Sequence, residues 1–126
     1  MRFVGFIKEL DNYPWATPFD NQLAENNAAV ELINNIVSYL EKGKLVLGWM
    51  GHFVDLQTKE HIAPHAYLSD GIWIWPSYYQ YYLKECPNYK LDKDFVNYIR
   101  EKDFTVELIF NEQALREEFI GKIEAK

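Results

Sequence analysis

Apolar residues at helical spacing mark three segments of the chain. The first stripe consists of Ala29, Ile33, Ile36, Val37 and Leu40. Because intervals of three and four residues place side chains on one side of an α-helix, this stripe predicts a helix that buries one face. Gly43 follows at the position where a glycine commonly ends a helix.

The two later helical segments also carry start signals. Asp92 and Asn111 each lie next to an apolar stripe, and both are residue types whose side chains cap helices. The stripes are Leu91, Phe95, Tyr98 and Ile99, and then Leu115, Phe119 and Ile123. Each region therefore predicts an amphipathic helix that begins just after its cap.

Short runs rich in β-branched and aromatic residues separate the helices and predict strands. They cover residues 3–7, 44–50, 53–56, 61–62, 72–75 and 104–110. The run at 44–50 is almost continuously apolar, which predicts burial on both faces. Residues 53–62 predict a hairpin that turns at Thr58–Glu60. The pattern predicts one α+β domain over residues 1–126, with a mostly antiparallel sheet of about four or five strands packed with about four helices.

Residues 70–82 hold six aromatic rings and change predicted structure three times. Asp70 and Gly71 are turn residues, and residues 72–75 are typical of a strand. Pro76 lacks the N–H that would continue a sheet ladder. Ser77 with Gln80 three residues later matches a capping box, so a short helix is predicted from Ser77 to about Cys86.

Composition narrows the classes of function. Aromatic residues reach 17%, an excess that suits a small core or a binding surface. The net charge of −6 argues against nucleic-acid binding, which needs clustered Lys and Arg, and favours a basic partner. No apolar run approaches the roughly 18 residues of a membrane span. The N-terminal residues lack the apolar core of a signal peptide, and Cys86 has no second cysteine to pair with, so we expect a cytoplasmic protein.

No pattern of catalytic or metal-binding residues stands out. His52, His61 and His65 fall close together, but Pro64 disfavours the helix that would place His61 and His65 on one face. Cys86 ends a predicted helix, whereas a helix N-terminus is what lowers a thiol pKa. The carboxylate pairs at residues 92–94 and 117–118 suit the ends and polar faces of helices. We expect no catalytic residue, no metal and no cofactor.

The aromatic segment remains as the candidate binding site. Trp73 and Trp75 point to one side of a predicted strand and can be either core or interface. Tyrosines lie on two rows of the following helix, and two rows cannot both face the same core. We therefore expect some of their hydroxyls to reach solvent or a partner, since Tyr and Trp commonly anchor interfaces. The predicted partner-binding residues are Asp70, Trp75, Tyr78, Tyr79 and Tyr81, with Trp15 from the proline-rich loop at 11–20.

The chain resembles a group of small bacterial immunity or antitoxin-like proteins of polymorphic-toxin systems. The similarity lies in an acid-Gly-x-Trp-x-Trp-Pro segment at residues 70–76, the pair Tyr81–Tyr82, and a Leu-x-x-x-Phe helix at residues 91–95. It covers about a third of the chain. The resemblance implies a cytosolic protein that binds and blocks a cognate toxin.

Three functions remain open from the sequence. The first is a non-catalytic immunity protein that occludes a cognate toxin, which the acidic charge predicts to be basic. The second is a small-molecule-binding accessory module with an aromatic pocket. The third is a small enzyme that uses His61, His65 and Asp70, with or without zinc.

Overall fold

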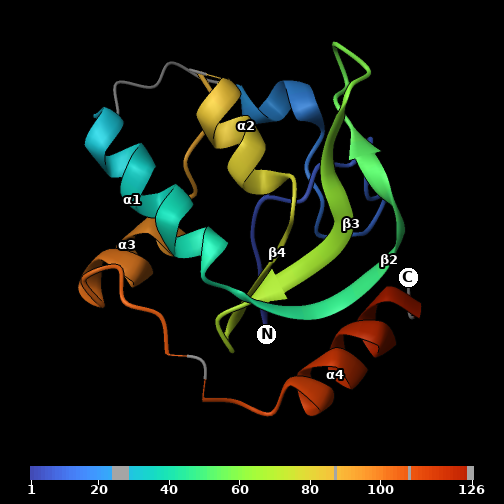
Figure 1. Ribbon diagram of the computed structural model, residues 1–126, viewed down its shortest axis with the longest axis vertical. Coiled ribbons are helices and arrows are strands. Elements are labelled where there is room, and N and C mark those ends of the chain that lie inside the picture. Colours follow the sequence, from blue (N-terminus) through green and yellow to red (C-terminus); the bar gives the residue numbers. More distant parts are fainter. Residues whose placement is uncertain (24–28, 87, 108, 125–126) are drawn as a thin grey trace.

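A computed structural model describes residues 1–23, 29–86, 88–107 and 109–124, and it has the predicted α+β architecture (Figure 1). Four strands form one mixed sheet in the order β1-β4-β3-β2. The strands are β1 (Arg2–Phe3), β2 (Lys44–Val54), β3 (His61–Ser69) and β4 (Trp73–Pro76). The helices are the 3-10 helix η1 (Phe19–Gln22), α1 (Val30–Glu41), α2 (Tyr79–Glu85), α3 (Lys93–Glu101) and α4 (Glu112–Glu124).

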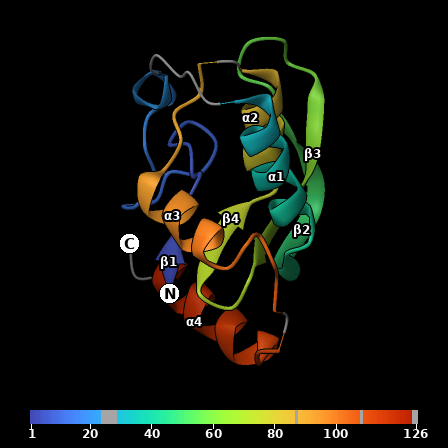
Figure 2. The ribbon, with the colours of Figure 1, turned by 90° about the vertical axis from the view of Figure 1, so that its left-hand side faces the viewer.

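The sheet separates two aromatic layers. On one side α1 and α3 cover β4, with Tyr39 and Phe95 packed against Trp75. On the other side the N-terminal segment and α4 cover β3, with Phe6 stacked on Tyr67 and Phe119 against the same ring. The helix α2 follows β4 directly and lies across the end of the sheet (Figures 1 and 2).

The helix start signals at Asp92 and Asn111 are confirmed. The Asp92 side chain accepts a hydrogen bond from the Phe95 N–H at 3.0 Å. The Asn111 side chain accepts one from the Ala114 N–H at 3.0 Å. Each cap satisfies a backbone donor that has no partner within its own helix.

The capping box predicted at Ser77 and Gln80 is wrong. The residue before α2 is Tyr78, and it makes no capping hydrogen bond through its side chain. The Ser77 hydroxyl instead donates to the Pro64 carbonyl, which ties the end of β4 to β3. The Ser77 hydroxyl thus bonds to a residue distant in the sequence instead of capping the helix.

Gly43 follows α1 for a different reason from the one predicted. It does not adopt a left-handed conformation, and the α1 C-cap is Lys42. A Cβ added at Gly43 would lie 2.4 Å from the Trp75 ring. The glycine is therefore explained by the close approach of backbone and indole.

Three strand predictions differ from the structure. The strand predicted at residues 3–7 is limited to Arg2–Phe3, which pairs in parallel with β4. No strand forms among the described residues of 104–110, where Phe104 has a positive φ of 56°, and Leu108 lies outside the described residues. The run at 44–50 belongs to β2, which is an edge strand with only Val46 and Phe53 buried, so the prediction of burial on both faces is wrong.

Candidate binding surfaces

Most of the predicted partner-binding aromatics lie in the core. The exposed fractions of Trp75, Tyr78 and Tyr79 are 1%, 0% and 1%. Trp73 is buried as well, so both tryptophans of the segment are core residues. These side chains are closed to a partner in this conformation.

The argument from two tyrosine rows is wrong because α2 has neighbours on more than one side. Tyr78, just before the helix, packs against Phe53 with ring centroids 4.6 Å apart. Tyr82 stacks on Tyr89 at 5.8 Å, and Tyr79 packs beside the same ring at 6.4 Å. Both rows therefore meet apolar partners, and neither has to face solvent.

Asp70 is also buried, and its role in the structure is local. Its Oδ1 accepts hydrogen bonds from the backbone N–H groups of Ile72 and Trp73, at 3.0 and 2.8 Å. Its Oδ2 accepts a hydrogen bond from the Tyr39 hydroxyl at 2.5 Å. The carboxylate fixes the turn between β3 and β4 and ties it to α1.

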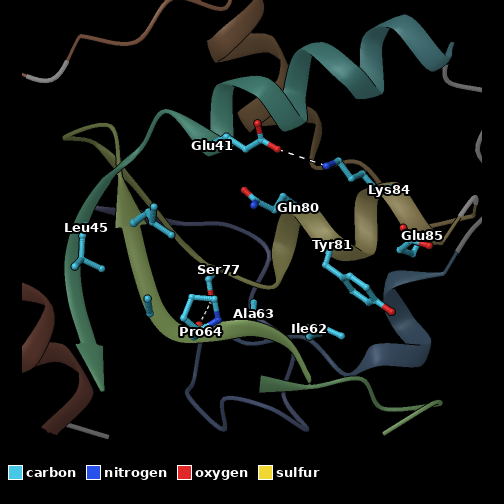
Figure 3. Close-up of a pocket in the computed structure, with 12 residues that line it drawn as sticks. Glu41, Leu45, Ile62, Ala63, Pro64, Ser77, Gln80, Tyr81, Lys84 and Glu85 are labelled. Carbon is cyan, nitrogen blue, oxygen red and sulfur yellow. Dashed lines mark hydrogen bonds and ion pairs between the residues drawn. The ribbon is translucent and has the colours of Figure 1, made fainter. Parts of the chain in front are cut away.

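Trp15 and Tyr81 are the predicted site residues that keep partial exposure. Trp15 stacks on Phe3 with ring centroids 4.1 Å apart, so much of its ring is used in packing. Tyr81 lies on α2 and lines a groove between that helix and β3 (Figure 3).

The groove has an apolar floor and a polar wall. Its volume is about 500 Å³, within the range of roughly 300–1,000 Å³ typical of ligand sites. The floor and the adjoining strand contribute Leu45, Ile62, Ala63, Pro64, Ala66 and Leu68. The wall comes from the helices, where Lys84 of α2 lies 3.5 Å from Glu41 of α1 and Gln80 projects beside this pair (Figure 3).

Tyr81 at the groove is held by Asp55 in the β2–β3 turn. Its hydroxyl donates to Asp55 Oδ2 at 2.6 Å, and this hydrogen bond raises the pKa of Tyr81 to about 12. Burial of Asp55 acts to raise its own pKa, but hydrogen bonds from Tyr81, Thr58 and Gln57 outweigh this effect and lower it. The turn thus carries an ionised carboxylate whose two oxygens already accept hydrogen bonds.

A second cavity lies on the opposite side of β3 and is more aromatic. Its volume is about 450 Å³, and it is lined by Leu10, Asp11, Asn12, Tyr13, Trp49, Met50 and His65. We call it the Trp49 cavity. Trp49 is 48% exposed and Met50 is 98% exposed, although both are large apolar residues.

A bulge in β2 presents these two side chains. Gly48 pairs with Ala66 and His52 pairs with Pro64, so residues 49–51 lie opposite the single residue His65. Gly51 has a φ of 105°, a left-handed conformation that glycine adopts without steric cost. The extra residues interrupt the regular ladder, so Trp49 and Met50 have no register partner on β3, although the Trp49 ring packs against His65 and Tyr67 of that strand.

Asp11 joins this cavity to the core. Tyr67 and Tyr78 donate their hydroxyls to its two carboxylate oxygens, at 2.5 and 2.9 Å. Burial, with the charge of Asp11, raises the pKa of Tyr67 and of Tyr78 well above the ordinary value, so both phenols remain hydrogen-bond donors. Asp11 is therefore a fixed acceptor at the base of the cavity.

The groups considered for catalysis do not converge. His52 and His61 stack with ring centroids 5.4 Å apart, whereas His65 packs against Phe53 at 4.5 Å. Among the residues that the structure describes, no three His, Cys, Asp or Glu side chains gather in a metal-binding arrangement. Burial raises the pKa of the Cys86 thiol, which opposes formation of a nucleophilic thiolate.

The sequence analysis did not identify Trp49 and Met50 as exposed residues. Trp49 and Met50 lie in a run that reads as a buried strand, and nothing in its periodicity marks the bulge. Gly48 and Gly51 on either side of the pair were the available signal, since glycine within a strand commonly marks a bulge. Within the described part of the chain, no helix is both long and apolar enough to span a membrane.

Comparisons with models of protein families, with curated proteins and with solved structures gave no match to this chain.

Proposed function

We propose that this chain is a non-catalytic protein-binding module that acts as an immunity protein, occluding a cognate toxin in the cytoplasm. The observation that carries the proposal is the exposure of Trp49 and Met50 on the β2 bulge. Trp73 and Trp75 lie in the core, and Trp49 is the tryptophan that the chain presents most openly.

Exposed apolar side chains of this size support a contact with another protein. Such residues on a soluble domain are commonly part of an interaction surface, and Trp is enriched among the residues that dominate binding energy. The Trp49 ring rests against His65, with ring centroids 5.0 Å apart. A ring that is already positioned loses little conformational entropy when a partner covers it.

The geometry of β2 favours recognition by side chains over addition of a strand. The bulge at residues 49–51 interrupts the regular ladder that a partner strand would need. Nearer the start of β2, the Val46 carbonyl already accepts a hydrogen bond from Arg116 Nε of α4 at 2.5 Å. The partner would therefore contact the Trp49–Met50 surface rather than extend the sheet.

The class of partner follows from charge and from resemblance. The net charge of −6 favours a basic partner and speeds encounter with it. The assignment to a toxin rests on the resemblance of residues 70–76, 81–82 and 91–95 to immunity-like proteins. Trp73, Trp75 and Phe95 of these segments are buried, so the resemblance concerns the fold and not the contact surface.

Co-expression with the product of the neighbouring gene tests the proposal. We expect the wild-type chain to restore growth of cells that express that product and to co-purify with it. Met50→Asp should weaken the complex, whereas Ile109→Asp should not, because Ile109 is similarly exposed at 96% but does not line the cavity. Absence of both rescue and complex would refute the toxin assignment, and a complex unaffected by Met50→Asp would refute the surface.

A second candidate function is binding of a planar small molecule. The Trp49 cavity supports it, since Tyr13, Trp49 and His65 provide aromatic walls. This function predicts a ligand-dependent rise in Tm without any protein partner. Screening the purified protein against aromatic metabolites by thermal shift separates the two candidates.

A further inference from the structure

We propose that the groove between α2 and β3 binds a free α-amino acid with a large apolar side chain, whose two charged groups face the Glu41–Lys84 ion pair. The groove lies on the other side of β3 from the Trp49 cavity. The inference therefore goes beyond the proposed function and does not depend on it.

The floor of the groove is an apolar face of the sheet that stays partly open. Alternate side chains of a strand point to the same side, so Ile62, Ala66 and Leu68 of β3 share the face that lines the groove. Leu45 of β2 extends this face, because it is the register partner of Leu68 and is 53% exposed. The single methyl group of Ala66 fills little of the space between its larger neighbours. The floor thus suits an apolar group of the size of a leucine or phenylalanine side chain.

The charges above this floor form a pair of opposite sign. Lys84 Nζ lies 3.5 Å from Glu41 Oε1, and the two side chains are 51% and 50% exposed. An α-amino acid carries its ammonium and carboxylate groups on one carbon atom, roughly 3 Å apart. Its ammonium can therefore face Glu41 while its carboxylate faces Lys84, so that the four charges alternate in sign. A ligand with one charge would cover the other member of the pair without compensating its lost hydration.

Gln80 supplies a third polar group for the same ligand. It lies four residues before Lys84, on the same face of α2, and its side chain projects into the groove beside the ion pair (Figure 3). The Gln80 amide makes no hydrogen bond to any of the residues that the structure describes. An amide accepts a hydrogen bond from an ammonium group and donates one to a carboxylate, so it can contact either end of an amino acid.

A titration with small probes tests the site directly. L-phenylalanine is added to the full chain while the backbone N–H resonances of Ala66 and Lys84 are followed by NMR. We expect a Kd of about 1 mM, an ordinary affinity for a ligand of this size in an open site. Phenylethylamine and 3-phenylpropanoate each lack one charge and should bind roughly three- to five-fold more weakly, the range of an exposed ion pair. Glycine lacks the apolar side chain and should give no measurable shift.

The comparison of probes can contradict each part of the proposal. Glu85 adds a second negative charge to the lining, so a simple amine is the main competing class of ligand. Phenylethylamine that binds as tightly as phenylalanine would overturn the choice of an amino acid. Glycine that binds equally well would overturn the role of the floor, and no shift with phenylalanine would overturn the site.

Charge reversal locates the ligand at the ion pair. Lys84→Glu should weaken phenylalanine binding about ten-fold, because an attraction becomes a repulsion. The double variant Glu41→Lys with Lys84→Glu restores a pair of opposite sign and should recover most of the affinity, with the ligand turned round. Lys44→Glu is the matched control, since Lys44 lies 3.8 Å from Glu112 in another exposed pair and does not line the groove. A double variant no better than Lys84→Glu, or an equal loss in Lys44→Glu, would overturn the proposal.

Met50→Asp separates this site from the proposed toxin surface. It should leave phenylalanine binding unchanged, and loss of binding would place the ligand in the Trp49 cavity and overturn the assignment to the groove. A chain that protects cells from the toxin but does not bind phenylalanine would overturn this inference alone. A chain that binds phenylalanine but gives no protection would overturn the proposed function alone.

Discussion

The Tyr78 hydroxyl donates a hydrogen bond to Asp11 at 2.9 Å and accepts one from the Ile7 N–H at the same distance. One phenol therefore joins the start of α2 to two points of the N-terminal segment. The group is fully buried, so no water can replace either bond.

Removal of this hydroxyl should be costly. Tyr78→Phe leaves the Ile7 N–H without its acceptor and Asp11 without one donor, and each such loss costs about 1–3 kcal/mol. We expect a decrease of about 2–4 kcal/mol in the free energy of unfolding, measured with urea. Tyr81→Phe is the matched control, since Asp55 keeps two backbone donors and the Tyr81–Asp55 hydrogen bond is only partly buried, and its cost should be below about 1 kcal/mol. An equal decrease in the free energy of unfolding in both variants would contradict a special contribution of the Tyr78 hydrogen bonds.

Two glycine substitutions should change the stability of the fold in opposite directions. In Gly43→Ala the new Cβ would meet the Trp75 ring at 2.4 Å, and relief of such a clash in a packed core costs about 1–3 kcal/mol. In Gly121→Ala, within α4, no atom lies within 4 Å of the new Cβ, and alanine is favoured over glycine in a helix by about 1 kcal/mol. Thermal unfolding of both variants measures the difference, and stabilisation by Gly43→Ala would be inconsistent with the close approach.

Substitution of Trp75 should lower the free energy of unfolding far more than substitution of Trp49. Trp75→Ala opens a large cavity beneath α1 and should lower the free energy of unfolding by about 3–5 kcal/mol. Trp49→Ala removes a half-exposed side chain and should change it by about 1 kcal/mol or less. Urea denaturation of both variants gives the comparison, and a large loss in Trp49→Ala would assign that indole to the core.

Stability should fall at alkaline pH, partly through Tyr81. Its pKa is raised from 10.0 to about 12, so between these values the unfolded chain loses the proton while the folded chain keeps it. Unfolding is then favoured as pH rises, and the stabilisation present below about pH 10 is lost towards pH 12. Urea midpoints at pH 9 and pH 11 measure this, and Tyr81→Phe should show a smaller decrease. An identical decrease in the variant would mean that Tyr81 does not contribute.

Local sequence signals predicted the structure correctly where the hydrogen bonds are local. Asp92 and Asn111 cap α3 and α4 as predicted, because the side chain and its backbone donor are three residues apart. Alternation at residues 104–110 failed as a strand signal, since those positions can pack against the core without pairing. Phe104 and Phe110 do so in the segment between α3 and α4.

Burial of the tyrosines was decided by contacts between distant parts of the chain. Helix geometry correctly separated two rows, but it carries no information on how many neighbours surround α2. Tyr89 and the N-terminal segment supply those neighbours. The exposure of Trp49 could not be predicted for the same reason, because strand periodicity does not reveal which strand lies at the edge of a sheet.

The β2 bulge frees residues 49–51 from the pairing rules that constrain the rest of the sheet. They have no register partner on β3, and the Trp49 ring packs against His65 and Tyr67 while the side chain stays 48% exposed. Substitutions there would cost little folding free energy, whereas changes to the buried aromatics would cost a great deal. If the proposed partner binds at this surface, its contact residues could therefore change without disturbing the scaffold that presents them.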